Sequence, residues 1–547
     1  MNHPPSFPFS AAHRAHHRER AQALQPVDLL VIGGGITGAG IARDAALRGL
    51  DVVLVEKNDL ASGTSSRSSK LIHGGLRYLE HLEFALVFEA VRERTRLREL
   101  APHLCSPTPF LFPVYKGIGL GMTALRAGLN LYDALSLFRV YKRHKTYNAD
   151  QALQVEPGLS PEDLQGCAVY YDSRTDDARL TVESALGAHN AGATILSYTR
   201  VESLLRDEEG HVQGVRLHDV LDELDFELTA RTVVSAVGPW TDQIRGPERQ
   251  AFMRPTKGVH IVVERSRLPV RHAVVLPNHD NRILFAIPWS HHTVLGTTDT
   301  DHDGSLDEIA AKRADIDYIL EVTNRMFPDA DLKPDDVVST WAGLRPLVAD
   351  PDAISASDVS REHIINTEDD GLIVIAGGKL TTYRSMAEEV VDKVARVLKR
   401  EHSRNAGPCR TDELPLPGAL EEHENPLIAL DEEVETHLKQ RYGTRWAKVG
   451  MIAENDPLLA GRIVPGLPDI WAELHYSVES ELCYTPSDFL RRRTQLLLRT
   501  RDQGMGVAPE TARRMAELLG WNEEQTKSRL EEYAHEAHLA DCWRSET

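Results

Sequence analysis

The sequence predicts an α/β protein that begins with a parallel sheet and ends in an all-helical region. Residues 27–32 (VDLLVI) and 51–56 (DVVLVE) are short apolar runs, typical of strands buried on both faces of such a sheet. Clustered glycines and a segment with helical spacing, which ends at Gly49, lie between them. Strand, helix and strand within about 30 residues form a βαβ unit, which predicts a Rossmann-like domain.

Strand patterns recur through the first 400 residues, and helical patterns dominate after them. A helix is predicted from about residue 379 to 399, and helical patterns return at 488–500 and 509–519. The segment 401–418 carries three prolines and two glycines, which indicates a linker. The other predicted strands are 193–197, 232–237, 258–263, 283–287, 293–297 and 371–376.

The composition is that of an ordinary globular protein with a strongly acidic balance. Hydrophobic residues make up 41% of the 547 residues and charged residues 26%, which excludes collagen-like, coiled-coil and wholly disordered chains. Lys and Arg number 62 against 82 Asp and Glu, and the net charge of −20 disfavours nucleic acid as a partner. No run of about 18 uncharged apolar residues occurs, so no transmembrane helix is predicted.

The cysteines and the N-terminus indicate the compartment. Five cysteines lie far apart without a C-x-x-C pair, which predicts neither a metal site nor a disulfide framework and suits a reducing cytosol. Residues 1–25 contain His and Arg but lack the apolar core of a secretory signal. We expect a disordered leader there; a mitochondrial transit peptide is the alternative, which the arginine content fits only faintly.

The loop VIGGGITGAG indicates a dinucleotide site. Gly33, Gly35 and Gly38 have G-x-G-x-x-G spacing directly after a strand and before a helix. Glycine is needed there for a tight turn, for backbone contact with a pyrophosphate and for close packing of helix on strand, and the helix N-terminus offers N–H groups to phosphates. Glu56 ends the second strand, where a carboxylate can accept both ribose hydroxyls. The spacing alone fits FAD or NAD.

The following segments favour FAD. Residues 61–84 are crowded with hydroxyls and glycines, as expected for a loop that passes along a pyrophosphate and a flavin. AVGPW at 236–240 and AGGKLTTYR at 376–384 place glycine clusters at the ends of two other predicted strands. Three glycine-rich strand ends that converge on one ligand suit a long dinucleotide bound across a sheet.

Six motifs resemble those of the FAD-dependent glycerol-3-phosphate dehydrogenases that reduce a quinone: SSKLIHGGLRYLE, AVGPW, KGVHIVV, GTTD (296–299), AGLRPL and GGKLTTYR. The resemblance covers about residues 26–400, with Val237 as a departure from the family's threonine, and extends in kind to DFLRRRT in the helical region. It implies an FAD-binding domain of the glutathione-reductase/D-amino-acid-oxidase type, a mixed-sheet substrate cap and an all-α C-terminal domain. No calcium-binding loop follows, so a bacterial-type enzyme is expected.

The expected division of the chain follows from these features. We expect the leader at 1–25, an FAD-dependent oxidoreductase part at 26–400, the linker at 401–418 and the helical domain at 419–547. Within 26–400, the FAD domain is expected to be discontinuous. Its expected segments are about 26–100, 165–245 and 340–400, and those of the cap are about 101–164 and 246–339.

The resemblance also implies the residues of the site. A phosphate dianion needs cationic and hydrogen-bonding groups, ideally an arginine fork. The matching substrate-binding residues are Arg77, Tyr78, Arg345, Lys379 and Thr381, with Thr382 as the alternative to Thr381. The expected FAD contacts are Gly33, Gly35, Gly38, Glu56, Ser65, Ser66, Ser68, Lys70, His73, Gly74, Gly75, Gly238, Gly377, Gly378, Leu380 and Thr381.

His260 and Arg345 are the candidate catalytic residues. Oxidation of a secondary alcohol needs a proton acceptor, and imidazole titrates near working pH while the strand around His260 would hold it rigidly. A buried structural histidine is the alternative. A nearby arginine would stabilise the alkoxide-like transition state.

The segment 116–145 is basic in an acidic protein, with six Lys and Arg against the single acid Asp133. Apolar residues recur at helical spacing in it, which fits either a helix in the headgroup layer of anionic lipid or an ordinary helix packed in the cap. The resemblance favours lipid, because a quinone lies in the membrane. The apolar residues are Ile118, Met122, Leu125, Leu129 and Tyr132.

The resemblance implies oxidation of sn-glycerol 3-phosphate to dihydroxyacetone phosphate, with electrons passed through FAD to a membrane quinone. The expected location is the cytoplasm, at the inner face of the cell membrane. A glycerol-3-phosphate oxidase, which passes the electrons to oxygen and releases hydrogen peroxide, is the alternative. An amine or amino-acid oxidase fits less well, because the cations exceed what one carboxylate needs. A non-catalytic flavin-binding scaffold is disfavoured, because the pocket keeps all of its cationic groups and a histidine. The oligomeric state, a homodimer included, stays open.

Overall fold

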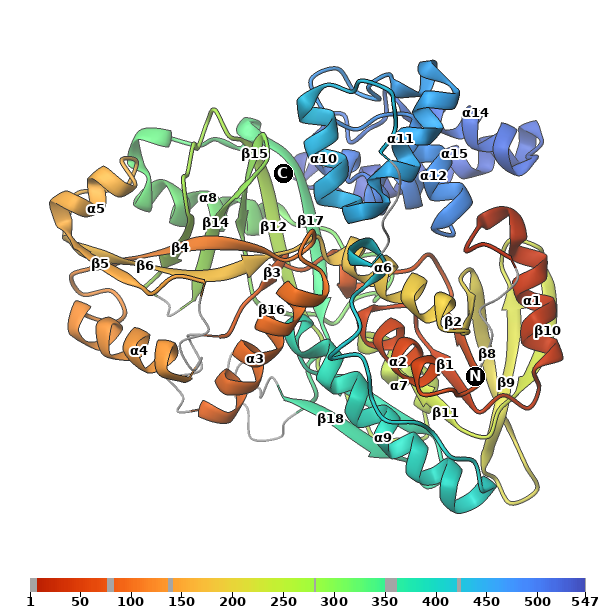
Figure 1. Cartoon of the computed structure of the whole chain (residues 1–547). Coiled ribbons are helices and arrows are strands. Elements are labelled where there is room, and N and C mark those ends of the chain that lie inside the picture. Colours follow the sequence, from red (N-terminus) through yellow and green to blue (C-terminus); the bar gives the residue numbers. More distant parts are fainter. Residues whose placement is uncertain are drawn as a thin grey trace.

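The computed structural model describes residues 7–75, 83–135, 141–279, 282–349, 362–420 and 425–546. Figure 1 shows three parts: a parallel-sheet domain, a large mixed sheet beside it, and a helical domain placed over the junction of the two. The predicted α/β class with a mixed-sheet second part and a helical C-terminal domain is confirmed. No helix in these residues combines the length and apolarity needed to cross a bilayer.

The parallel sheet has the strand order β18-β19-β11-β1-β2-β7, with β18 antiparallel at one edge. The predicted βαβ unit is confirmed as β1, the helix α2 (Ile36–Leu47) and β2. Two further helices flank α2, namely α6 (Asp177–Asn190) and α9 (Tyr383–His402). The strands are β1 Leu29–Ile32, β2 Val52–Val55, β7 Thr194–Leu196, β11 Val233–Ser235, β18 His363–Thr367 and β19 Ile373–Gly377.

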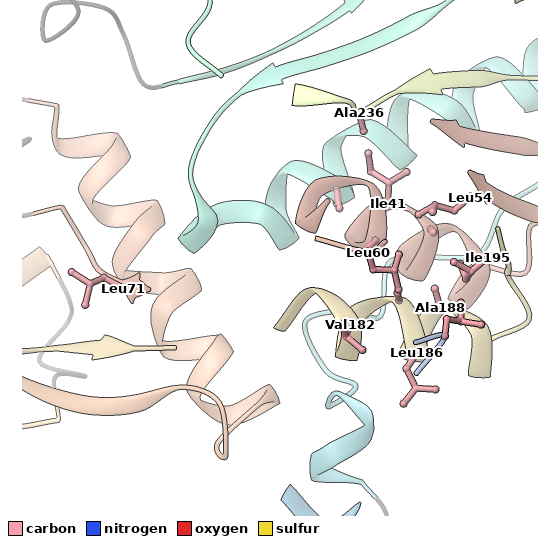
Figure 2. Packing of buried hydrophobic residues seen from close by; sticks show 14 of the residues in the cluster. Ile41, Leu54, Leu60, Leu71, Val182, Leu186, Ala188, Ile195 and Ala236 are labelled. Atoms are coloured by element: carbon pink, nitrogen blue, oxygen red, sulfur yellow. The ribbon is translucent and has the colours of Figure 1, made fainter. Parts of the chain in front are cut away.

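The core of this domain lies where α2 packs between the sheet and α6 (Figure 2). Ile41 of α2, Leu54 of β2 and Ile195 of β7 are completely or almost completely buried. Each such side chain stabilises the fold by about 1.5–3 kcal/mol through removal of apolar surface from water. The alanines and glycines of α2 keep the helix close to its neighbours, which brings its N-terminus to the ends of the strands.

A three-stranded antiparallel meander follows β7. It consists of β8 (Thr199–Arg206), β9 (Val212–Asp219) and β10 (Leu224–Thr229). Its inner face buries Val215, Leu217 and Leu228 against the parallel sheet. The meander was not among the predicted strands.

The mixed sheet forms the cap, with strand order β16-β12-β15-β14-β13-β4-β6-β3; β17 also pairs with β12, and β5 with β6. Its strands β6 and β17 continue to Arg174 and Arg345, past the expected cap boundaries near 164 and 339. The strands are β3 Leu71–Ile72, β4 Ser106–Tyr115, β5 Lys145–Asn148, β6 Leu164–Arg174, β12 Thr256–Glu264, β13 Ala273–Pro277, β14 Ile283–Trp289, β15 His292–Gly296, β16 Thr300–Asp301 and β17 Val337–Arg345. The helices of this region are α3 Phe84–Leu100, α4 Met122–Leu135, α5 Ala149–Val155 and α8 Arg313–Met326, and the short α7 Thr241–Arg245 precedes β12.

The C-terminal domain contains helices and no named strand within residues 425–546. The helix predicted at 488–500 is instead a π-helical turn, Asp488–Arg493, and a short α-helix, α13 (Leu496–Arg499), separated at Gln495, whose φ is +60°. The linker is held to both sheets' regions, since the Gly407 N–H donates to the Arg48 carbonyl beside α2 (2.8 Å) and the Leu416 N–H to the Leu100 carbonyl at the end of α3 (2.8 Å). The remaining helices are α10 Glu432–Tyr442, α11 Trp446–Asn455, α12 Ala472–Ser480, α14 Ala508–Leu519 and α15 Glu523–Leu539.

The prediction of a disordered leader is wrong for residues 7–25. This segment folds as a 3-10 turn (Ala11–His13) and the helix α1 (Arg14–Ala23), and it packs on the parallel-sheet domain. Arg14 donates to Asp219 (Nη2–Oδ1, 2.7 Å) and to the carbonyl of Ser197 (2.6 Å), while the Ser10 hydroxyl donates to Val478 in the C-terminal domain. The polar composition of the segment concealed these distant partners.

Two histidines buried where the N-terminal segment packs on the rest of the protein should make the stability of the fold decrease as the pH is lowered. Burial lowers the pKa of His17 to about 3, helped by His189 at a ring distance of 5.3 Å, and burial also lowers the pKa of His189 to about 4. Unfolded histidine titrates near 6.5. Between these pKa values the two histidines bind protons in the unfolded chain but not in the folded one. The stability that they leave intact above about pH 6.5 is therefore lost as the pH falls toward 4.

We expect His17→Phe to remove about 1–2 kcal/mol of the stability loss between pH 7 and pH 5. Urea denaturation at the two pH values measures this difference. His16→Phe is the control, because His16 is exposed on the same helix and should leave the pH dependence unchanged. Equal pH dependence in wild type and His17→Phe would contradict the assignment.

Candidate functional site

A cavity of about 880 Å³ lies at the carboxyl ends of β1, β2, β11 and β19. Ligands of open parallel sheets bind at this edge, and the volume lies within the roughly 300–1,000 Å³ of small-molecule sites. The three predicted glycine-rich strand ends do converge there. Their residues on the cavity wall include Gly33 and Gly35, Gly238, and Gly377 and Gly378.

The glycine loop meets three separate requirements. Gly33 has φ +112°, and a Cβ on it would lie 2.7 Å from the Ala236 carbonyl oxygen. A Cβ on Gly38 would overlap the carbonyl oxygen of Gly33, so Gly38 allows α2 to pack on β1 and does not line the cavity. Gly35 faces the cavity, where a Cβ would meet only the Ser65 hydroxyl at 3.2 Å. These are the turn, packing and ligand-approach positions of a dinucleotide loop.

Glu56 lies on the cavity wall at the end of β2. Its carboxylate accepts the N–H of Gly34 (2.7 Å) and that of Asn58 (2.9 Å), which fixes it between the glycine loop and the next turn. Burial raises the pKa of Glu56, and the two N–H donors oppose that shift. A carboxylate held in this way can accept hydroxyl donors from the cavity.

Other predicted cofactor residues divide into two groups. Ser65, Ser68 and Leu380 line the cavity, whereas Ser66, Lys70, His73, Gly74, Gly75 and Thr381 are not part of its wall. Lys70 forms a buried ion pair with Asp177 (2.6 Å), and the Thr381 hydroxyl bonds the backbone N–H and carbonyl of His73 (both 3.2 Å). Lys70 and Thr381 thus contact other protein groups, and these contacts join the chain around residues 70–73 to Asp177 and Thr381 beside the cavity.

Comparisons with known proteins identify the family. A family model described as FAD dependent oxidoreductase matches residues 28–384, and one described as the C-terminal domain of alpha-glycerophosphate oxidase matches residues 409–526. The aerobic glycerol-3-phosphate dehydrogenase of Staphylococcus haemolyticus is 37% identical over 534 residues and 94% of each chain. That of Bacillus subtilis is 40% identical over 484 residues, 85% of this chain and 86% of the relative. The chain belongs to the aerobic glycerol-3-phosphate dehydrogenase family.

Solved structures agree with this family and with its cofactor. The glycerol-3-phosphate dehydrogenase from Bacillus halodurans complexed with FAD superposes with a TM-score of 0.79 at 37% identity, covering 97% of this chain and 98% of that chain. An L-alpha-glycerophosphate oxidase from Mycoplasma pneumoniae with FAD bound has a TM-score of 0.53 at 17% identity, covering 72% and 99% of the two chains, and shares the fold. FAD is the cofactor of this dehydrogenase-family chain.

The residues present fit FAD. The Gly35 position leaves room for a pyrophosphate beside the N-terminus of α2, and the Ser65 hydroxyl already accepts the N–H of Ile36 there (2.9 Å). Glu56 lies on the same wall, where its carboxylate could accept ribose hydroxyls. FAD would be held by the glycine loop, by Glu56 and Ser65, and by the turns at Gly238 and Gly377.

The structure brings two of the predicted substrate-binding residues, Arg345 and Lys379, to the cavity wall. Arg345 ends β17, and its guanidinium pairs with Asp299 (2.9 Å) and donates to the Thr297 hydroxyl (3.2 Å) and the Thr298 carbonyl (3.0 Å). These partners belong to the GTTD motif, which thereby orients the arginine. Arg77 and Tyr78 lie outside the described residues.

His260 lies behind this wall in β12. Its ring stacks on Trp341 (4.7 Å between ring centroids), and Nε2 is 2.8 Å from the Ser69 hydroxyl. Burial lowers the pKa of His260 to about 3, with the positive charges of Arg345 and Lys70 adding to the shift. The imidazole is therefore neutral across the physiological range.

Several cavity residues were missed by the sequence analysis. Arg67 follows the predicted Ser66, and the C-terminal domain contributes Ser487, Arg492 and Glu536. The DFLRRRT motif was the available signal for the second group, but three consecutive arginines read as a solvated surface. Only the long-range partners of these arginines show that they are buried.

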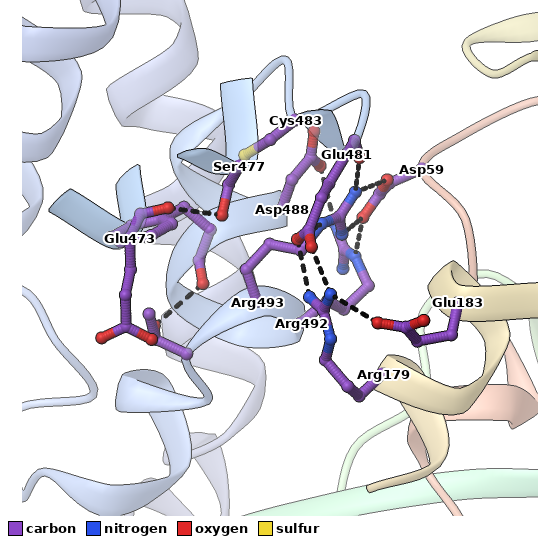
Figure 3. A network of polar contacts seen from close by, with 12 residues as sticks. Asp59, Arg179, Glu183, Glu473, Ser477, Glu481, Cys483, Asp488, Arg492 and Arg493 are labelled. Carbon is purple, nitrogen blue, oxygen red and sulfur yellow. Dashed lines mark hydrogen bonds and ion pairs between the residues drawn. The ribbon is translucent and has the colours of Figure 1, made fainter. Parts of the chain in front are cut away.

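Figure 3 shows the network that holds these arginines. Asp59, three residues after Glu56, accepts from Arg493 through both carboxylate oxygens (2.8 and 2.9 Å) and from Arg492 (2.5 Å). Burial acts against the ionised carboxylate, but the charges of Arg493 and Arg492 hold the pKa of Asp59 below its usual value. A second buried group joins Arg179 to Glu481 and Glu183. The C-terminal domain is thereby fixed to the loop that follows Glu56.

We expect Gly35→Val to purify colourless and folded. Its φ of −74° suits valine, so the side chain should fill the space of the pyrophosphate without straining the backbone. Flavin absorbance of the purified protein and its far-UV circular dichroism test this. Gly121→Val, at an exposed position with no atom within 4 Å of the added Cβ, should remain yellow. A fully flavinylated Gly35→Val variant would show that the loop is only a turn.

Proposed function

We propose that this protein oxidises sn-glycerol 3-phosphate to dihydroxyacetone phosphate and passes the electrons through FAD to a membrane quinone. The observation that carries the proposal is the 37–40% identity, over most of the chain, to proteins named aerobic glycerol-3-phosphate dehydrogenase. Arg345 and Lys379 on the wall of the cofactor cavity are the cations that a phosphorylated substrate requires.

FAD, when bound, supplies the hydride acceptor, and the protein supplies position, charge and a base. The Arg345 fork, steadied by Asp299, is proposed to bind the substrate phosphate and Lys379 to assist it. We assign His260 as the proton acceptor. Its pKa of about 3 keeps the imidazole neutral and able to take a proton but makes it a weak base, so the assignment rests on the resemblance and on the strand that holds the ring.

Anaerobic titration of the purified holoenzyme with glycerol 3-phosphate tests the reaction. Stoichiometric bleaching of the flavin absorbance is expected, and no bleaching would overturn the proposal. Reoxidation by a short-chain quinone should be faster than by oxygen. Stoichiometric peroxide under air, with no faster turnover on quinone, would instead identify the oxidase.

An enzyme at the inner face of the membrane needs a surface that contacts lipid. The apolar residues of segment 116–145 do not form that surface, because Leu125, Leu129 and Tyr132 of α4 are buried against the cap. The prediction that this face of the helix contacts lipid is therefore wrong. Helix α3 lies beside α4 (Figure 1). Large apolar side chains are exposed instead on α3, at Leu131 of α4 and at Tyr141 after it, and the most basic stretch begins at the next residue, Lys142. The exposed apolar residues are Phe84, Phe88, Leu131 and Tyr141, and the exposed cations are Lys142, Arg143 and Lys145.

We expect replacement of Lys142, Arg143 and Lys145 by glutamate to release the protein from anionic vesicles. Each basic residue near such a surface contributes about 1 kcal/mol, so three reversals should weaken binding by several kcal/mol. Sedimentation with phosphatidylglycerol vesicles measures binding. Activity with a water-soluble dye acceptor should stay nearly intact. Triple replacement of Arg216, Lys439 and Lys527, exposed elsewhere, is the charge-matched control, and equal sedimentation of the two variants would refute this surface.

A further inference from the structure

Arg67 differs from the other arginines on the cavity wall in having no carboxylate partner. Arg200 pairs with Glu202 (2.6 Å), Arg345 with Asp299 (2.9 Å) and Arg492 with Asp59 (2.5 Å). Among the described residues, no ion pair within 4.0 Å joins Arg67 to an acid. Its described hydrogen bond is a long one, from Nη1 to the Ala342 carbonyl (3.4 Å), and its buried Nε has no partner.

The surroundings of Arg67 are unfavourable for a cation. Burial, together with the neighbouring charges of Arg491 and Arg492, lowers the pKa of its guanidinium to about 9. Glu536 and Asp307 act in the other direction, but Glu536 is already paired with Arg491 (3.1 Å). Arg67 is partly exposed to the cavity and otherwise buried. An unpaired charge that is largely removed from water destabilises a protein, so this arginine favours an anion that enters the cavity.

The position of Arg67 indicates which anion. It caps the 3-10 turn Thr64–Ser66, and the Ser65 hydroxyl in that turn accepts the first N–H of α2 beside Gly35. This is the end of the helix where the diphosphate of a dinucleotide binds. The helix N-terminus supplies only about half an elementary charge, which leaves most of a dianion uncompensated. The carboxylate of Glu56 on the same wall is also negative and so cannot compensate the charge of the dianion.

We propose that Arg67 is the counter-ion of the FAD diphosphate, kept unpaired by the protein and neutralised when the cofactor binds. The C-terminal domain shares in this arrangement, because Glu536 and Asp59 engage Arg491 and Arg492 and leave Arg67 as the cation available to the ligand. The inference concerns cofactor affinity and does not depend on which substrate the enzyme oxidises.

The test compares apo-protein and FAD-loaded protein of Arg67→Met, in which the side chain keeps an unbranched apolar stem and loses the charged guanidinium. We expect the apo form to melt at the same or a higher temperature than wild-type apo-protein, because a buried unpaired charge has been removed. FAD affinity, measured by quenching of flavin fluorescence, should fall by about ten- to hundredfold. Arg67→Lys should fall between wild type and Arg67→Met.

Two comparisons separate this role from a structural one. ADP and adenosine compete with FAD for the cavity, and Arg67→Met should weaken ADP while leaving adenosine unchanged, because only ADP carries the diphosphate. Arg174→Met is the matched control: Arg174 also has a pKa lowered by burial and donates only to a carbonyl, that of Pro288 (3.3 Å), but it lies in the mixed sheet off the cavity wall. It should leave FAD affinity unchanged. A less stable Arg67→Met apo-protein with wild-type FAD affinity, or equal loss of ADP and adenosine binding, would overturn the proposal.

Discussion

Asp59→Leu is expected to lower the free energy of unfolding by about 3–5 kcal/mol, because it leaves two buried guanidinium groups without their shared carboxylate. Arg492 and Arg493 both donate to Asp59, and none of the three side chains is more than 5% exposed. Their mutual repulsion is then no longer offset. Urea denaturation followed by tryptophan fluorescence and by circular dichroism measures the loss and shows whether the C-terminal domain separates first.

The control for Asp59→Leu is an ion pair that stays in water. Arg216 and Glu227 pair across β9 and β10 (2.9 Å) with both side chains at least half exposed, so Glu227→Gln should cost less than about 1 kcal/mol. A loss in Asp59→Leu as small as in this control would mean that the arginines find other partners. Because Asp59 lies three residues from Glu56, FAD retention should fall together with stability.

Arg345→Lys is expected to lower kcat/KM for glycerol 3-phosphate by about ten- to hundredfold. Lysine keeps the charge but loses the second hydrogen bond of the fork, which is worth about 1.5–3 kcal/mol toward a charged group. The Asp299 and Thr297 contacts that orient the guanidinium have no equivalent for a flexible ammonium group. Steady-state kinetics with a dye acceptor measures the change.

Glycerol, which lacks the phosphate, shows which part of the substrate Arg345 contacts. If Arg345 binds phosphate, the slow reaction with glycerol should be the same in wild type and Arg345→Lys. A parallel loss on both substrates would place the arginine at the carbinol instead, where it would stabilise the developing alkoxide. No change on either substrate would remove Arg345 from the site.

Local sequence was sufficient for most strands of the parallel sheet and for several strands of the mixed sheet. The βαβ unit, the strands β7, β11 and β19 of the parallel sheet, the strands β12, β14 and β15 of the mixed sheet, and the three glycine clusters were all predicted from short patterns, whereas β18 was not. Apolar runs, helix spacing and glycine requirements are properties of neighbouring residues, which is why these predictions succeeded. The meander β8–β10 was missed because exposed, often charged residues alternate with its buried ones, so its strands contain no long apolar run.

The sequence by itself indicated the family, through six motifs spread over residues 26–400, and with them FAD as the cofactor. It also indicated the edge of the sheet where a dinucleotide binds, because the glycine spacing acts within one βαβ unit. Only the tertiary structure decided which charged groups are solvated and which are buried. Arg14 on α1, Arg492 and Arg493 in DFLRRRT, and the inward-facing stripe of α4 all lie in segments whose composition predicts exposure. The physical reason is that a buried charge depends on a partner such as Asp219 or Asp59, which lies hundreds of residues away in the chain. A local sequence pattern contains no information about such a partner.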